Sequence, residues 1–397
     1  MTVLQTPPLK GLRVLDLSRL LPGPFLTLLL ADQGADVTKI EAPSGGDWVR
    51  WIPPLCGPIS IQFSALNRGK KSIALNLKSP DGVEILKRLV KDADVLVESF
   101  RPGVMDRLGV GYDALSKLNP ALVYVAVTGY GQDGAYKDRA GHDLNYSSLA
   151  ATVGLTGKLG GDPIMAGFQL ADISGALYGV IGALSAVYAR QNDGQGRFVD
   201  VSLAESALSF NVLTLASEFN GTDPVVRGGD RLGGGAACYQ LYECSDGGWF
   251  SVGALEPKFW HLFCDVVEKP EWKIRHMGDD EALKKDIAAL FKTRTRDEWE
   301  AIFSRVDACC EPVLNLNELD AHPLHTSRKN FFDLKQSPDH PPLRQARTPL
   351  MAPEHTQNVS PAPDLGEHTR QLLAQAGYST EQIDTFIKSG TASGSSN

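Results

Sequence analysis

The segment DRAGHDLNYSSLA (residues 138–150) contains one histidine, His142, in a stretch that glycine interrupts too early for a regular helix. Histidine changes its charge closer to neutral pH than any other unperturbed side chain, so His142 could carry a proton, bind a metal or face solvent. Asp172 follows later, directly before a segment rich in small residues. A His and an Asp that meet at one edge of a sheet can act as acid and base, although spacing alone does not show that these two meet.

Asp172 has both a structural and a functional interpretation. As an N-cap residue, it would accept hydrogen bonds from the first backbone N–H groups of the helix that follows. The dipole of that helix would also hold the carboxylate ionised, and the small residues beyond it would leave room for a ligand. The two interpretations are compatible, so we predict a capped helix start that also serves as a binding or catalytic group.

Two further motifs and the cysteines do not indicate a binding or catalytic site. GYGQDG (residues 129–134) matches the GxGxxG pattern of dinucleotide-binding loops, but the segment after it contains Gly141 and opens no helix that could hold a pyrophosphate. We therefore predict a tight loop there. HPLH (residues 322–325) lacks the glutamate and the helical spacing of a metalloprotease site. The six cysteines form no CxxC pair, so we predict reduced thiols and no metal site.

Length and charge narrow the class of protein. At 397 residues the chain is long enough for two domains, and its formal net charge of -8 opposes a general attraction to nucleic acid or to an anionic membrane. A local basic pocket for a small polyanion remains compatible with that charge. The apolar run LLPGPFLTLLLA is short and holds two prolines, so we expect no membrane-spanning segment. Since no signal peptide is evident, we expect a cytoplasmic protein.

The first half of the chain alternates strand-like and helix-like segments, which is typical of β-α-β units. This rhythm predicts an α/β fold with a Rossmann-like parallel sheet. Ser79 followed by Pro80 predicts a helix start. A later helix over residues 173–190 has small residues on one side, which would let another backbone approach closely.

The second half predicts a smaller α+β domain. YQLYECSDGGWFSVGA is typical of a hairpin, Thr295 with Glu298 predicts a capping box, and Ser379 with Gln382 predicts the start of a last helix. The predicted boundaries, in chain order, are the first part of a large α/β domain over 1–212, a linker over 213–235, a small domain over 236–330, a return segment with C-terminal helices that join the large domain over 331–389, and a disordered tail over 390–397.

Several segments, taken in order, resemble the family III CoA-transferase superfamily, and most of all its alpha-methylacyl-CoA racemase branch. The resemblance covers nearly the whole chain from about Gly11 onward. Its motifs are LSRLLPGPFLTLLLADQGADVTKIEAPSGGD, NRGKKSIALNLKSPDG, DVLVESFRPGVMDRLG, VTGYGQDGAYKDRAGHDLNY, QLADISG, VGALEPKFW and ACCEPVLNLNELDAHP.

The resemblance implies an interlocked homodimer with a CoA cleft between the large domain of one subunit and the small domain of the other. Racemases of this family use the His of GHDINY and the Asp of LADFAGG as paired acid and base, which match His142 and Asp172. The Glu of GAIEPQF matches Glu256, which would orient the histidine, and Asp143 would line the same site. The implied role is acyl-CoA conversion in lipid metabolism.

The resemblance also implies where CoA binds. Contacts would fall on Arg50 or nearby, on the strand around Ala74 and Leu75, and on Arg101 and Arg107. The CoA moiety of the acyl-CoA substrate is then the only cofactor-like group, and neither nucleic acid nor membrane is an expected partner.

Two departures from the racemase pattern keep a second reaction open. LADISGALYG lacks the glycine run that often follows the aspartate, and the segment after IEAPSGGD carries an insertion that transferases commonly have. In a transferase, Asp172 would attack an acyl-CoA to form a mixed anhydride, CoA would pass to a second acid, and His142 would only position groups. A CoA-binding regulatory protein is the third hypothesis, which the presence of all the candidate catalytic residues opposes.

A racemase needs two acid/base groups that flank the carbon next to the thioester, since one face loses a proton and the other gains one. Hydrogen-bond donors must also meet the charge that develops on the thioester oxygen. We expect backbone amides at the start of the helix beyond Asp172 to supply them.

Overall fold

The computed structural model describes residues 7–221, 223–278 and 280–394. Within these ranges the chain divides into two compact units. The first unit takes in the described residues up to Leu149, then Gln169–Ser209 and the described residues from Pro323 onward. The second unit consists of Ala150–Phe168 and Phe210–His322. It therefore includes residues that the sequence boundaries assign to the large domain, because the chain leaves the first unit twice.

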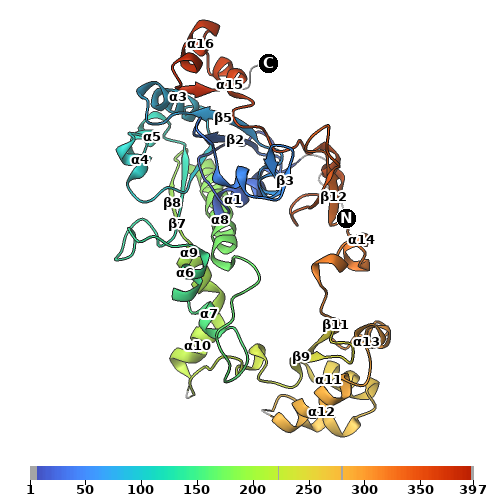
Figure 1. Ribbon diagram of the computed structural model, residues 1–397. Coiled ribbons are helices and arrows are strands. Elements are labelled where there is room, and N and C mark those ends of the chain that lie inside the picture. Colours follow the sequence, from blue (N-terminus) through green and yellow to red (C-terminus); the bar gives the residue numbers. More distant parts are fainter. Residues whose placement is uncertain (1–6, 222, 279, 395–397) are drawn as a thin grey trace. The chain divides into compact units, whose positions relative to one another are not determined.

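A seven-stranded sheet in the order β14-β5-β2-β1-β6-β7-β8 forms the centre of the first unit (Figure 1). All its pairings are parallel except that of β14 with β5. The first strand of the chain is central and the order reverses beside it, as in doubly wound nucleotide-binding folds. The predicted parallel α/β sheet is confirmed. Its strands are β1 (Arg13–Asp16), β2 (Asp36–Glu41), β5 (Lys71–Leu75), β6 (Val95–Glu98), β7 (Val123–Thr128), β8 (Phe198–Ser202) and β14 (Ala392–Ser393).

Helices cover both faces of this sheet, which is why all six residues of β7 are buried. Helices α1 (Pro22–Ala31) and α8 (Leu170–Asp193) pack on one face. The helices of the other face share its apolar core, and α3, α15 and α16 lie beside β5 (Figure 1). They are α3 (Pro80–Val90), α4 (Val104–Arg107), α5 (Tyr112–Leu118), α15 (Thr369–Gln375) and α16 (Thr380–Lys388). Both predicted helix starts are confirmed, since α3 begins after Ser79 and Ser379 forms a capping box with Gln382.

Shorter elements complete the first unit. They are η1 (Trp48–Trp51), β3 (Leu55–Cys56), β4 (Ile59–Ser60), α2 (Ile61–Asn67), α6 (Asp143–Leu149), α9 (Leu203–Leu208), α14 (Pro323–Ser327), β12 (Phe331–Leu334), β13 (Leu343–Ala346) and η6 (Pro353–Asn358). The transferase-like insertion identified in the sequence forms η1 and the β3–β4 hairpin.

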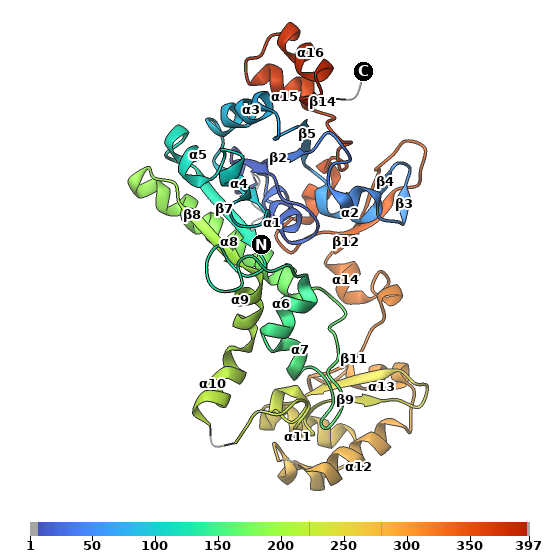
Figure 2. The ribbon, with the colours of Figure 1, turned by 60° about the vertical axis from the view of Figure 1, so that its left-hand side comes forward.

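The second unit contains a three-stranded antiparallel sheet in the order β11-β10-β9, with α11, α12 and α13 beside it (Figure 2). Its core is aromatic, and Trp260, Phe263 and Phe291 are fully buried. The predicted β9–β10 hairpin and the Thr295–Glu298 capping box are confirmed. The main elements are α7 (Thr152–Leu155), η2 (Ser209–Asn211, at the boundary), α10 (Val212–Asn220), η3 (Arg231–Gly233), β9 (Tyr239–Glu243), β10 (Trp249–Gly253), α11 (Pro257–Val266), η4 (Pro270–Arg275), α12 (Glu281–Phe291), α13 (Arg296–Phe303), β11 (Cys310–Pro312) and η5 (Leu316–Glu318).

Helix α8 is long and apolar enough, by length and composition alone, to cross a membrane, whereas the sequence analysis expected no such segment. In the first unit its small residues face the sheet and α1. A Cβ on Gly179 would lie 2.2 Å from Cδ1 of Leu26, and a Cβ on Gly182 would lie 2.6 Å from Cγ1 of Val199. The glycines therefore allow the close packing that the sequence predicts, and this packing holds the middle of α8 against α1 and the sheet.

The C-terminal segment differs from the disordered tail predicted over 390–397. Ala392 and Ser393 pair with Leu75 and Ala74, and the Asn76 N–H donates to the Thr391 carbonyl over 2.8 Å. An edge strand exposes unpaired backbone groups, and this short segment pairs with them. The part of the predicted tail after residue 394 lies outside the described residues.

A pair of glycine substitutions tests the packing of α8. Alanine is about 1 kcal/mol better than glycine in a helix, so Gly154→Ala in α7, where a Cβ meets nothing within 4 Å, should leave stability unchanged or raise it. Gly179→Ala should instead lower the free energy of unfolding by about 1–3 kcal/mol, because the new Cβ overlaps the buried Leu26. Chemical denaturation of both variants measures the difference, and equal stability would contradict the packing.

Candidate active site

A cavity of about 500 Å³ opens at the carboxyl edge of the sheet in the first unit. Its wall comes from the segments that follow β1, β6 and β7 and from the start of α8. Examples are Leu20, Phe100, Tyr130 and Asp172. Ligands of doubly wound folds bind at this edge, where the strand order reverses. The fold therefore places the cavity where a substrate site is expected.

The cavity brings together His142 and Asp172, which the sequence could only place near each other by hypothesis. His142 precedes α6, and its backbone N–H donates to Oδ1 of Asn145 over 3.0 Å. The side chain is exposed, and no hydrogen bond of its imidazole ring occurs within the described part of the chain. The imidazole is therefore available to a molecule in the cavity.

Asp143 caps α8. Its Oδ1 accepts the N–H of Ala171 over 2.7 Å and that of Asp172 over 3.1 Å. The predicted N-cap role of Asp172 is therefore wrong. Asp172 lies inside the first turn of α8, and Asp143 accepts the N–H groups at the start of that helix. The Ile173 N–H donates to the Gln169 carbonyl. These amides are already in use, so they do not supply the donors expected for a thioester oxygen.

The carboxyl group of Asp172 is also not held ionised as the sequence analysis predicts. Burial raises its pKa from 3.8 to about 7, and the negative charge of Asp143 adds to this effect. Desolvation therefore outweighs the helix dipole at this position. A group with a pKa near neutrality can both give and take a proton, which is what a catalytic acid or base requires.

Tyr146 is a site residue that the sequence analysis missed, although it ends the GHDLNY motif. Its hydroxyl donates to the Gly141 carbonyl, and its ring stands edge-on to Tyr130 at 5.0 Å between centroids. A Cβ on Gly129 would lie 2.5 Å from Cε1 of Tyr146, and a Cβ on Gly141 would lie 2.6 Å from the same atom. These glycines therefore serve to admit the tyrosine ring, and the GYGQDG segment forms a loop of the cavity wall.

The cavity wall is rich in cations. Arg19, Arg101, Lys137 and Arg139 line it, and Asp172 is the acidic residue in the described lining. On a chain of net charge -8, such a cluster is a local attraction for a polyanion. Of the two arginines predicted to contact CoA in this region, Arg101 lines the cavity, whereas Arg107 lies in α4 outside the described lining.

The other predicted CoA contacts lie elsewhere in the first unit. Arg50 is buried and donates to both carboxylate oxygens of Glu41, over 2.8 and 2.6 Å, and to the Pro363 carbonyl. Ala74 and Leu75 are buried in β5, whose outer edge is paired with the C-terminal strand. Contacts of CoA with these three residues stay predictions, and the structure gives each of them a structural role.

Glu256 belongs to the second unit, where it is the N-cap residue of α11. Its predicted contact with His142 stays a prediction. A glutamate at this position satisfies the helix dipole whether or not it also meets a histidine.

A fully buried cluster of charged side chains supports the segment after β1, which forms part of the cavity wall. The Lys70 ammonium group contacts Asp16 at 3.2 Å, and the Lys39 ammonium group contacts Asp47 at 3.1 Å. Asp47 also accepts the N–H of Leu20 over 3.2 Å, and Leu20 has a φ of 68°. Left-handed backbone is costly for leucine, so these buried charges hold the turn in place.

The raised pKa of Asp172 predicts a pH-dependent stability. The folded chain holds this proton more tightly than the unfolded chain. Protonated Asp172 therefore contributes its full share to the free energy of unfolding below about pH 4, and this share is lost as pH rises through about 7. Asp172→Asn should therefore be more stable than wild type at pH 8 by roughly 1–3 kcal/mol, with the difference gone in acid. Thermal unfolding across pH measures it, with the exposed Asp339→Asn as control. Identical pH profiles for Asp172→Asn and wild type would contradict the burial of this charge.

Comparison with known proteins identifies the family. The family model of CoA-transferase family III matches residues 9–369. Human alpha-methylacyl-CoA racemase is 34% identical over 382 residues, covering 94% of this chain and 95% of the relative. Mouse succinyl-CoA:glutarate CoA-transferase is 31% identical over 399 residues, covering 96% and 90%. The crystal structure of a CAIB/BAIF family protein from Brucella suis has a TM-score of 0.80 at 28% identity, covering 94% of this chain and 100% of that chain. The chain belongs to CoA-transferase family III.

Proposed function

We propose that this enzyme is a racemase of 2-methylacyl-CoA thioesters that exchanges the proton on the carbon next to the thioester. The observation that carries the proposal is the presence of His142 and Asp172 in one cavity. The relatives include both racemases and CoA-transferases, so the choice between the two reactions depends on the chemistry of these side chains.

Inversion at this carbon needs one group that removes the proton and another that returns a proton to the opposite face. The pKa of Asp172, about 7, means that this carboxyl group exists in both protonation states at neutral pH. The exposed imidazole of His142 is the second proton carrier. In each direction of the reaction one group acts as the base and the other as the acid.

In the transferase reaction Asp172 would act as a nucleophile instead of as an acid or a base. A nucleophilic carboxylate has to be ionised, as a general base does, so a pKa of about 7 serves either reaction at neutral pH. The transferase-like insertion is absent from the described lining of the cavity, since η1 and the β3–β4 hairpin contribute no residue to it. The position of this insertion favours proton transfer over anhydride formation.

The cations of the wall suit the phosphate groups of an acyl-CoA. Arg101 and Lys137 come from two different loops, so they could contact separate phosphates. The CoA moiety then anchors the substrate while the acyl carbon reaches His142 and Asp172. No group beyond the substrate itself enters this proposal.

We also propose that the enzyme is a homodimer. Helix α10 has no buried residue in the described chain, and Val212, Leu213 and Phe219 are each at least 66% exposed. A short helix gains most of its stability from packing, and a bare apolar face is typical of an interface. A second copy of the chain would cover this face, and in an interlocked dimer it would also bring Glu256 to the histidine.

The first test of the proposed function is incubation of the enzyme with one epimer of a 2-methylacyl-CoA in deuterated water. We expect both epimers to form and deuterium to enter the α-position without any added acid, because proton exchange alone suffices. Chiral chromatography and mass spectrometry measure the two results. His142→Ala and Asp172→Ala should each abolish interconversion of the epimers.

The transferase alternative predicts a different pattern in the same experiment. The substrate would show no exchange, CoA would pass to an added carboxylate, and hydroxylamine would trap an anhydride on Asp172. Asp172→Ala would then be inactive while His142→Ala kept part of its activity. This pattern would make the racemase proposal wrong.

The homodimer is tested by light scattering over a range of low concentrations. Wild type should scatter as a dimer, and the double variant Val212→Ser with Phe219→Ser should shift toward the monomer, because the exposed apolar face is lost. Ile274→Ser removes a side chain that is 92% exposed on another element and serves as the matched control. A wild-type monomer that is fully active would contradict the proposal.

A further inference from the structure

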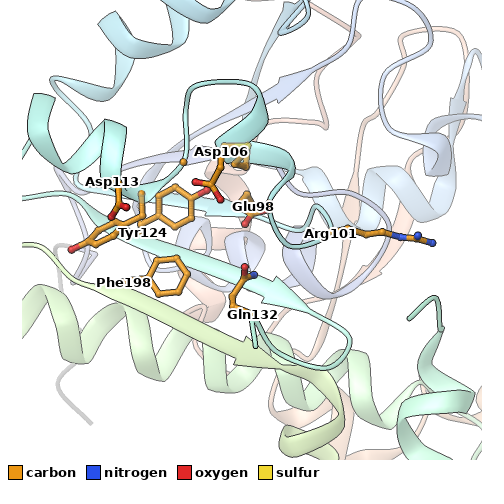
Figure 3. Close-up of a pocket in the computed structure, with 11 residues that line it drawn as sticks. Glu98, Arg101, Asp106, Asp113, Tyr124, Gln132 and Phe198 are labelled. Carbon is orange, nitrogen blue, oxygen red and sulfur yellow. The ribbon is translucent and has the colours of Figure 1, made fainter. Parts of the chain in front are cut away.

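A second, smaller cavity of about 260 Å³ lies on the α4–α5 side of the sheet (Figure 3). Glu98 from the end of β6, Asp106 from α4 and Asp113 from α5 give it an acidic lining. Arg101 lines both this cavity and the larger one, and in Figure 3 its side chain points away from the acidic groups. Arg101 therefore lies between the cation-rich wall of the larger cavity and the carboxyl groups of the smaller one.

Glu98 is tied to the turn that carries Arg101. The side chain is almost fully buried, and its Oε2 accepts the N–H of Phe100 over 2.6 Å. The next residue, Ser99, accepts the N–H of Arg19 at its Oγ over 3.0 Å, and the Arg19 guanidinium lies 5.0 Å from the centre of the Phe100 ring. The carboxyl group of Glu98 thus helps to fix a turn whose next residues line the larger cavity.

The surroundings of Glu98 disfavour a negative charge. Burial is the main cause that raises the pKa of Glu98 to about 8; the negative charges of Asp106 and Asp200 act in the same direction, and the hydrogen bond from the Phe100 N–H opposes them. The titratable groups that face it are Asp106 from α4, Tyr112 and Asp113 from α5, Tyr124 from β7, Asp200 from β8 and, as the single cation of the described lining, Arg101. An ionised Glu98 would therefore have Arg101 as its available counter-charge.

We propose that Glu98 is a positioning residue for CoA recognition: uncharged, it holds the Phe100–Arg101 turn and leaves Arg101 directed to the larger cavity. When Glu98 loses its proton, the added negative charge attracts Arg101 toward the acidic cavity and away from the CoA phosphates. The inference rests on the proposed function in one respect, namely that a CoA thioester occupies the larger cavity.

Calorimetric binding of acetyl-CoA, which has no free thiol to titrate, tests this role. Wild type should lose roughly tenfold in affinity between about pH 7 and about pH 9.5, the usual loss for one charged hydrogen bond. Glu98→Gln keeps an acceptor for the Phe100 N–H but cannot ionise, so its affinity should stay constant over this range. Arg101→Ala should bind weakly at every pH with no such fall. Asp113→Asn, which changes the same cavity without touching the turn, should behave like wild type.

The outcomes separate the two proposals. A Glu98→Gln enzyme that loses affinity with pH as wild type does would overturn the role of Glu98 while acyl-CoA binding stands. A fall with pH that persists in Arg101→Ala would overturn it as well. Wild type that binds no acetyl-CoA at any pH would instead contradict the proposed function, and the inference would fail with it. Glu98→Ala should bind weakly at neutral pH, because the turn loses its acceptor.

Discussion

The carboxylate of Asp143 holds the candidate site together. It lies next to His142 in the chain and accepts the N–H groups of Ala171 and Asp172 at the start of α8. One side chain thus joins the loop that carries the histidine to the helix that carries the aspartate. Its negative charge also adds to the burial that raises the pKa of Asp172 to about 7. The geometry and the proton affinity of the site therefore depend on the same interaction.

The sheet supplies the frame for this interaction. Reversal of strand order beside β1 leaves the loops after β1 and β6 on either side of one opening, and both loops line the larger cavity. A buried acidic side chain holds each loop from behind. Asp47 fixes the turn at Leu20, and Glu98 fixes the turn at Phe100. Buried polar groups that are fully bonded give a precise wall, and each one also makes the wall sensitive to loss of a partner.

Patterns of local origin could be predicted from the sequence. Alternating segments predicted the parallel sheet, Thr295 with Glu298 predicted a capping box, and Ser379 with Gln382 predicted a helix start, because these signals depend on neighbouring residues. The spacing of His142 and Asp172 is a weak signal, and only the family resemblance implied that they act as a pair; the fold brings them to one cavity.

Features that depend on distant residues could not be predicted. Asp172 sits where an N-cap is expected, but Asp143 from another element takes that role. Its proton affinity follows from burial, which no local pattern shows. The last strand was assigned to a disordered tail because its small polar residues carry no strand signal, and only the open edge of β5 makes it a strand. The burial of Arg50 against Glu41 is likewise a product of the folded chain.

We propose that His142 and Asp172 each serve one face of the substrate carbon. The most direct measurement is α-deuterium exchange, in deuterated water, of each pure epimer of a 2-methylacyl-CoA by the two single variants. We expect complementary results: Asp172→Asn exchanges the proton of one epimer only, and His142→Ala exchanges that of the other epimer only. Exchange of both epimers by either variant, or loss of exchange from the same epimer in both variants, would contradict it.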